Sequence, residues 1–317
     1  MNQLTMFVKR NRVIFLSYAS ALLILIVVSI LRPGFGSASH LRVIAIDAAV
    51  LGIIALGQTF VIITGGIDLS IPWTVTVAAI FLTRMGAGQN INLVIIILIT
   101  LLGTTMVGLI NGLGISYLKI PPIIMTLGMN SILMGGLLGI TGGAPGGNTP
   151  PIIRFIAVGN VRQIPLILIF WILIIVIATI VLAYSPLGQR LYAIGNNEMV
   201  AIFSGVNVRL NKLIAYGISG FASGLGGILL AGRIGQSYLG MGNPFLFQSV
   251  IAVAIGGASI LGGSGNYIGT VAGALILTIL NGLLPAFKMP TSAQQIVYGA
   301  VLLIAVIATR NQTLSNK

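Results

Sequence analysis

Cysteine is absent from this sequence of 317 residues, and only three side chains are acidic: Asp47, Asp68 and Glu198. Without cysteine the chain can form neither a disulfide nor a thiolate metal site. Its single histidine, His40, excludes a histidine metal cluster. Paired carboxylates, a catalytic triad and the phosphate-binding pattern GxxxxGK[ST] are also missing. We therefore expect no cofactor, no metal and no enzyme activity, and the chain itself should not hydrolyse ATP.

Charge is scarce throughout the chain. Charged residues make up 6% of it, 57% are hydrophobic, and mean hydropathy is +1.10. A soluble domain carries about 25% charged residues because its surface must be wetted, so this chain must lie mostly in a bilayer. The net charge of +13 is spread over loops and chain ends. Nucleic-acid binding needs a basic face, so contact with anionic lipid headgroups is the expected role of these charges.

Ten apolar runs predict an all-α polytopic membrane protein with about ten transmembrane helices, forming one transmembrane domain over residues 1–317. The runs are Val13 to Leu31, Val43 to Thr64, Ile71 to Thr83, Ile91 to Tyr117, Pro121 to Ile140, Ile164 to Tyr184, Leu213 to Ala231, Val250 to Leu261, Ile268 to Leu284 and Gln294 to Ala308. A full span needs about 20 residues, so the third and eighth runs predict short or broken helices near Gly65–Ser70 and Val250–Gly265. The 42 glycines suit close helix packing in lipid.

Basic residues indicate how the chain enters the membrane. Lys9, Arg10 and Arg12 precede the first run, which places the N-terminus in the cytoplasm and predicts a retained helix rather than a signal peptide. Ten crossings would place both termini and the polar interval 185–212 in the cytoplasm. The Gly/Pro-rich segment after Ile140, and residues 233–248, would then lie outside. If the eighth run is re-entrant, the C-terminus lies outside instead.

Two segments resemble each other within the chain. Asn111-Gly112-Leu113 is followed by Lys119-Ile120-Pro121, and Asn281-Gly282-Leu283 is followed by Lys288-Met289-Pro290. In a chain with ten spans they would lie at opposite membrane faces, as inverted repeats do in many transporters. Such short matches also arise by chance in a chain rich in Gly, Leu and Ile, so both interpretations stay open.

The longest well-marked polar interval between two apolar blocks is Ser185 to Lys212, which contains the acid Glu198. It is either a surface that a water-soluble partner binds or an ordinary solvated loop. The other two acids lie at the edges of membrane runs. Asp68 could cap the third helix or serve substrate or proton transfer. We expect Asp47 to pair with Arg42, about one helical turn away.

Four stretches resemble one family. They are GGIDLS from Gly65, NGLGISYLKIPPIIMTLG from Asn111, YAIGNNEMVAIFSGV from Tyr192, and VIAVAIGGASILGGSGNYIGTVAGALIL from Val250. Together they resemble the permease subunit of bacterial sugar ABC importers of the ribose, galactose and xylose type, which is related to branched-chain amino-acid permeases. The resemblance covers about Val43 to Ile307.

The resemblance implies an assembly in the bacterial inner membrane. Its parts are two permease subunits, identical or different, two cytoplasmic ATP-binding subunits and a periplasmic sugar-binding protein. It implies contact with the ATPase through the loop that Tyr192 to Val206 matches, as a short helix around Glu198. The residues assigned to this coupling are Tyr192, Gly195, Asn196, Asn197, Glu198, Ala201, Ser204 and Gly205. Two departures from the family pattern are Ile71-Pro72 after GGIDLS, and Pro244–Gln248 where an acid of a Glu-Leu pair is usual.

The favoured function is a permease for a neutral monosaccharide, since a path with few charges suits an uncharged solute. Side chains inside or beside the runs that could line the path are Gln58, Thr59, Phe60, Asp68, Trp73, Thr126 and Asn130. For each of them, packing between helices is the favoured interpretation. The alternatives are a proton- or sodium-coupled secondary carrier that uses Asp68 and Asp47, and a membrane scaffold that transports nothing.

Overall fold

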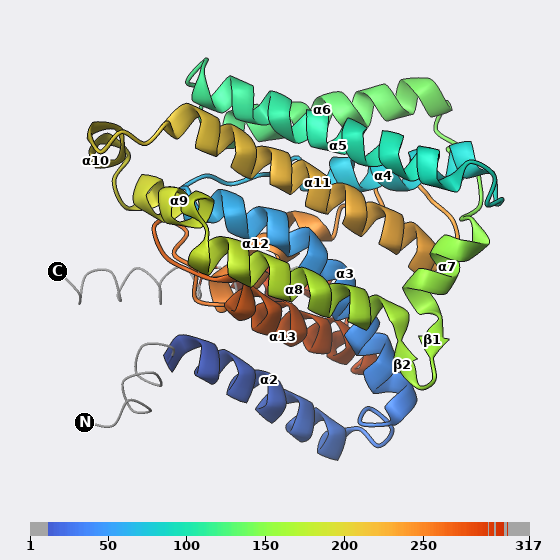
Figure 1. Cartoon of the computed structure of the whole chain (residues 1–317). Helices are drawn as coiled ribbons and strands as arrows, with labels where there is room; N and C mark the ends of the chain where they lie inside the picture. The colour runs from blue at the N-terminus through green and yellow to red at the C-terminus, as the bar shows by residue number, and fades with distance from the viewer. Residues whose placement is uncertain (1–11, 291, 295, 301–302, 304–317) are drawn as a thin grey trace.

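The computed structural model describes residues 12–290, 292–294, 296–300 and 303, which form a bundle of helices (Figure 1). The helices are α2 (Arg12–Leu31), α3 (Ala38–Ile63), α4 (Ile71–Gly86), α5 (Leu93–Ser116), α6 (Pro122–Thr141), α7 (Pro151–Val158), α8 (Leu166–Tyr184), α9 (Pro186–Asn196), α10 (Glu198–Phe203), α11 (Val208–Ile234), α12 (Phe245–Ile255) and α13 (Tyr267–Ala286). Two short strands, β1 (Asn160–Val161) and β2 (Ile164–Pro165), pair antiparallel between α7 and α8.

The prediction of an all-α polytopic membrane protein is confirmed. Within the described residues seven helices are long and apolar enough to cross a membrane, and α4 and α12 are shorter apolar helices. These nine correspond to the first nine predicted runs. The tenth run, Gln294 to Ala308, lies largely outside the described residues, so the total of ten stays a prediction. The two short helices are the ones that the run lengths predicted.

Helix α11 lies at the centre of the bundle and packs on α3, α4 and α5. Glycines let α5 and α11 approach closely. A Cβ at Gly108 of α5 would lie 2.1 Å from the carbonyl oxygen of Tyr216, and one at Gly220 of α11 would lie 2.2 Å from that of Thr104. Only glycine fits at such a crossing, where backbone contacts replace side-chain packing.

Helix α3 forms much of the core, whereas α2, α6 and α8 lie at the periphery (Figure 1). On α3 the residues from Ala48 to Ile63 are buried almost without exception, including Gln58 and Thr59. On the peripheral helices many leucine and isoleucine side chains are exposed. Exposed apolar side chains of this density match the hydrocarbon of a bilayer.

The break between α3 and α4 is a tight turn, as the glycine pair predicted. Gly65 has a φ of +80°, which glycine adopts without strain. Gly66 lies so close to α11 that an added Cβ would be 2.5 Å from the phenol oxygen of Tyr216. Pro72 occupies the first turn of α4, where its missing N–H leaves no hydrogen bond unmade. The Ile71-Pro72 departure is therefore compatible with the helix start.

The two ends of the bundle differ. Helices α9 and α10 lie at one end, and α7 with the β1–β2 hairpin lies at the other (Figure 1). The sequence predicted only a loop between residues 141 and 163, so α7 and the hairpin are elements that the sequence did not predict.

Lys119 and Lys288, in the two similar segments, both have left-handed backbones with φ of +56° and +55°. This shared geometry supports the inverted-repeat interpretation.

Candidate functional site

The polar interval folds into two short helices at one end of the bundle. The hydroxyl of Ser185 accepts a hydrogen bond from the Gly188 amide at the start of α9, and the side chain of Asn197 accepts one from the Val200 amide at the start of α10. Side-chain acceptors at these positions satisfy amides that the first turn leaves free. Gly205, with a φ of +79°, ends the turn after α10. The short helix predicted at Glu198 is present.

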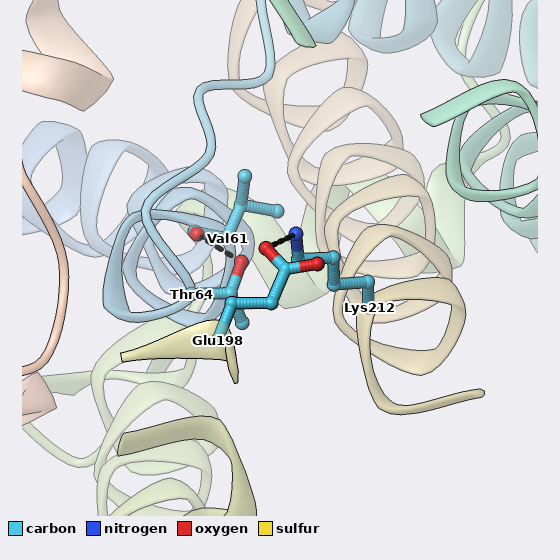
Figure 2. Close-up of polar contacts among 4 residues, drawn as sticks. All are labelled: Val61, Thr64, Glu198 and Lys212. Carbon is cyan, nitrogen blue, oxygen red and sulfur yellow. Dashed lines mark hydrogen bonds and ion pairs between the residues drawn. The ribbon is translucent and has the colours of Figure 1, made fainter. Parts of the chain in front are cut away.

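Helix α10 is tied to α11 by one ion pair. The carboxylate of Glu198 accepts from the ammonium of Lys212 at 2.5 Å, across the connection between the two helices (Figure 2). The same view shows Thr64, at the end of α3, donating to the carbonyl of Val61. The Glu198 side chain is half exposed, and surface ion pairs contribute about 0–1 kcal/mol. The pair orients α10 more than it stabilises the fold.

Three of the residues predicted for ATPase contact make contacts with other parts of the bundle. The Tyr192 hydroxyl donates to the Gly265 carbonyl at 2.7 Å, and the Asn196 amide donates to the Gly263 carbonyl at 3.3 Å. A Cβ on Gly195 would lie 1.9 Å from the Ile63 carbonyl. Burial raises the pKa of the Tyr192 phenol, so it keeps its proton and its donor role. These residues attach α9 to the loop after α12 and to the end of α3.

The outer face of α10 is apolar, which the sequence interpretation did not single out. Met199, Val200, Ile202 and Phe203 are exposed, Phe203 by 81%. Only Ala201 is buried, against Ile194 and Val208. The available signal was the apolar run Met-Val-Ala-Ile-Phe inside a polar interval. Clustered exposed apolar side chains with a polar surround mark an interaction surface.

A groove of about 950 Å³ runs beside α10, towards the turn between α5 and α6. Its walls are formed by Ile115, Ser116, Tyr117, Lys119, Ile120, Pro121, Pro122, Glu198, Met199, Ile202, Val206, Asn207, Val208, Arg209 and Lys212. Lys119, Arg209 and Lys212 contribute three cations against the one carboxylate of Glu198. The Arg209 guanidinium lies 5.6 Å from the ring centre of Tyr117. The groove is therefore basic and partly apolar.

A second polar cluster lies buried at the break between α3 and α4. One carboxylate oxygen of Asp68 accepts from the Ser70 amide at 2.9 Å and from the Ser70 hydroxyl at 2.6 Å. The other accepts from the Ser219 hydroxyl of α11 at 2.6 Å. The prediction that Asp68 caps α4 is wrong in its geometry. The N-cap is Ser70, and no side chain bonds the first-turn amides. Asp68 instead holds the turn before the helix and joins it to α11.

The cluster also includes hydrogen bonds with side chains of α3, α5 and α6. The side-chain oxygen of Gln58 on α3 accepts from the Asp68 amide at 3.3 Å, and the Asn111 amide of α5 donates to the Ser70 hydroxyl at 2.9 Å. Thr126 of α6 donates to the Ile67 carbonyl at 3.4 Å. Four helices are thus hydrogen-bonded to the break, and three of its side chains are predicted path residues: Gln58, Asp68 and Thr126.

Comparison with known proteins identifies the family. A family model described as "branched-chain amino acid transport system / permease component" matches residues 41–306. The chain belongs to this permease family.

Relatives of the permease are import proteins. It is 34% identical to the ribose import permease protein of Bacillus subtilis over 92% of this chain and 91% of the relative. It is 30% identical to the ribose import permease protein of Haemophilus influenzae with the same coverage. It is 32% identical to the autoinducer 2 import system permease protein of Photorhabdus laumondii over 82% of this chain and 80% of the relative. No solved structure matches. Together with the membrane helices, these relatives make the permease a multi-pass inner-membrane protein.

The remaining predicted path residues of the permease are packed inside it. The Thr59 hydroxyl is hydrogen-bonded to that of Thr270 at 2.9 Å. Phe60 and Trp73 are buried among apolar side chains. Asn130 on α6 differs, because its side-chain oxygen is buried without a hydrogen-bond partner in the described part.

The acid Asp47 has a different partner from the one predicted. It pairs with Arg233 at the end of α11, with 3.1 Å between the guanidinium and the carboxylate. Arg42 instead donates to the Gln163 carbonyl of the hairpin at 3.5 Å. The pairing with Arg42 is therefore wrong: Arg42 reaches across to the hairpin, while the C-terminal end of α11 brings Arg233 to α3.

Proposed function

We propose that the permease is the membrane-spanning subunit of an ATP-driven importer, which receives a neutral monosaccharide from a periplasmic binding protein. The observation that carries the proposal is the exposed apolar face of α10, at the end of the bundle where only polar segments are expected. A soluble subunit that covers Phe203 and its neighbours would bury that face. The ribose import permeases among the relatives support the solute class.

A continuous set of contacts leads from α10 to the buried break. Helix α9 precedes α10 directly and bonds the loop at Gly263 through Asn196. The amide of Gly263 donates to the Ile63 carbonyl at 2.9 Å, and Ile63 ends α3 just before the break. A displacement of α10 by the ATPase would therefore shift the segment that Asp68 anchors. Tyr192, Gly195 and Asn196 act in this arrangement as links rather than as the docking surface.

The same geometry argues against the alternative of a proton- or sodium-coupled carrier. Both oxygens of Asp68 accept hydrogen bonds from the protein's own groups, and Asp47 is paired with Arg233. A coupling acid must exchange its proton or ion with solvent or solute during each cycle. Asp68 is buried and so has no contact with solvent in this structure, and the half-exposed Asp47 carboxylate is held by the Arg233 guanidinium. We propose that two permease subunits, identical or different, complete the path.

Pull-down of the ATP-binding subunit and solute uptake in proteoliposomes test the proposal. Phe203→Ser should reduce both, because truncating an anchor of an interface commonly costs about 2 kcal/mol or more, about 30-fold in affinity. Glu198→Lys should also weaken recovery while insertion in the membrane stays normal. Phe247→Ser is the matched control, since Phe247 is exposed on α12 away from α10. Unchanged recovery and uptake with Phe203→Ser would rule out α10 as the docking helix.

A further inference from the structure

A cavity of about 260 Å³ lies inside the protomer near the first residues of α3, away from α10. Its walls come from α3, α11, α12 and α13, which meet where α3 begins and α13 ends. The lining residues are His40, Val43, Ile44, Asp47, Val50, Leu51, Leu230, Pro244, Phe245, Gln248, Thr278, Asn281 and Gly282. Drug-sized ligands occupy pockets of about 300–1,000 Å³, so this cavity takes a smaller molecule, of the size of one sugar ring.

Polar groups in the wall lack partners within the described part of the chain. The Nε2 atom of His40 is buried without a hydrogen bond. Gln248 is buried as well, and its side-chain amide has no hydrogen-bond partner among the described residues. The Asn281 oxygen accepts from the Tyr298 hydroxyl, which leaves the Asn281 NH₂ free. Buried polar groups are normally satisfied, so donors and acceptors remain here for a bound molecule.

The wall also carries apolar surface and no uncompensated charge among its described residues. Phe245 and Pro244 lie beside the polar groups, on the segment that departs from the family pattern. The one acid, Asp47, is paired with Arg233. A zwitterion or an anion would need charged partners of its own, because burying an unpaired charge is costly. A neutral molecule with hydroxyl edges and C–H faces matches both kinds of wall.

From this geometry we infer that each protomer holds a binding site for a neutral monosaccharide between α3, α11, α12 and α13, with Gln248 and Asn281 as hydrogen-bonding side chains. All the residues that line this site belong to one protomer. The inference rests on the proposed function for its solute class, but binding to the isolated permease needs neither ATP nor a partner.

The lack of native cysteine allows a direct test on the purified permease in nanodiscs. A single cysteine replaces Thr278, a buried residue of the wall, and its modification by a small methanethiosulfonate reagent is timed. D-ribose, D-xylose, D-galactose and L-leucine are the probes. A sugar at about ten times its Kd should slow modification about tenfold. Adding Gln248→Leu should raise the concentration for half protection about three- to tenfold, because one hydrogen bond is lost.

Met199→Cys on α10 is the control, since its exposed side chain lies outside the cavity, and its modification should not respond to sugar. Val50→Cys is the second position in the wall, at a residue that donates no hydrogen bond to the sugar. Equal protection at Met199→Cys, protection by L-leucine alone, or protection by no sugar would each overturn the inference. So would a failure of both wall cysteines to react, because a closed cavity cannot take solute. Uptake and ATPase recovery are measured separately, so either result leaves the α10 proposal to its own test.

Discussion

Asp68 is the one acid without an ion-pair partner in the described part of the chain, since Glu198 pairs with Lys212 and Asp47 with Arg233. Its two oxygens instead receive three hydrogen bonds from Ser70 and Ser219. Hydrogen bonds to a charged group are stronger than those between neutral groups. At this residue the carboxylate therefore works as an acceptor that joins the turn to α11.

Substitution of Asp68 separates the acceptor role from a proton-carrying role. Asparagine keeps an acceptor oxygen for Ser70, and the Ser219 hydroxyl can rotate to accept from the new NH₂ group. Asp68→Asn should therefore keep most uptake. Asp68→Ala leaves buried hydroxyls without an acceptor and should lose about 1–3 kcal/mol of stability for each such group. Uptake in vesicles and thermal stability in detergent measure the two effects. An Asp68→Asn variant as inactive as Asp68→Ala would contradict the acceptor role.

The direction of a side chain is what the sequence could not provide. The match to the family motif indicated which residues form the segment from Tyr192 to Val206, but not which of them face the bundle. Tyr192, Gly195 and Asn196 turned inward because the loop at Gly263 lies beneath α9. The partner of Asp47 was missed for the same reason: Arg233 lies far along the chain, and only the packing of α11 on α3 brings it near.

Among the elements, the crossing of α5 and α11 depends on glycine more than on apolar contact. Gly108→Ala should disrupt it, because the new Cβ would lie 2.1 Å from a backbone oxygen that cannot move away alone. Gly103→Ala is the matched control on the same helix, where an added Cβ meets nothing within 4 Å. That change should be neutral or stabilise α5, since alanine is favoured over glycine in a helix by about 1 kcal/mol.

Size-exclusion profiles and thermal stability of the two variants provide the measurement. We expect Gly108→Ala to lower the melting temperature or yield aggregated protein, and Gly103→Ala to match the parent. Equal profiles would show that the two helices can separate at this crossing without cost.

Helix spans could be predicted well, because lipid demands a fixed length of apolar sequence. Their ends could not. Helix α3 begins at Ala38 and α11 at Val208, several residues before the apolar runs Val43–Thr64 and Leu213–Ala231. Those first turns are polar and capped by Ser37 and Asn207. A hydropathy window reports only the part of a helix in hydrocarbon. The additional helix α7 lies in a segment that Gly and Pro made look irregular.

At the scale of the whole molecule, the energy source of transport can be predicted from what the buried acids do. Since Asp68 and Asp47 are both engaged within the protein, uptake should follow internal ATP and should not change with a protonophore when ATP is held constant. Vesicles reconstituted with the permease, its ATP-binding subunit and its binding protein allow both conditions to be set independently. Collapse of uptake with the protonophore at constant ATP would support a secondary carrier instead.

The overall architecture was predictable because composition alone excluded a soluble fold. The assembly of this protein with its partners was not predictable from composition. The exposed apolar face of α10 indicates an interaction surface but does not identify the protein that covers it. Family resemblance supplied the kind of partner, and the structure supplied the candidate contact residues. The proposed sugar site rests on a few polar side chains such as Gln248 and Asn281, which hydropathy does not distinguish from packing.

The hydrogen bond from the Gly263 amide to the Ile63 carbonyl can report movement of α9 through its rate of hydrogen exchange. An amide proton exchanges with deuterated solvent only while its bond is open. If ATP hydrolysis pulls α9 away from its seat, the peptide containing Gly263 should gain deuterium faster during turnover than at rest. The exchange rate of this one amide would then show how often a movement driven by ATP hydrolysis in the cytoplasm reaches the membrane interior.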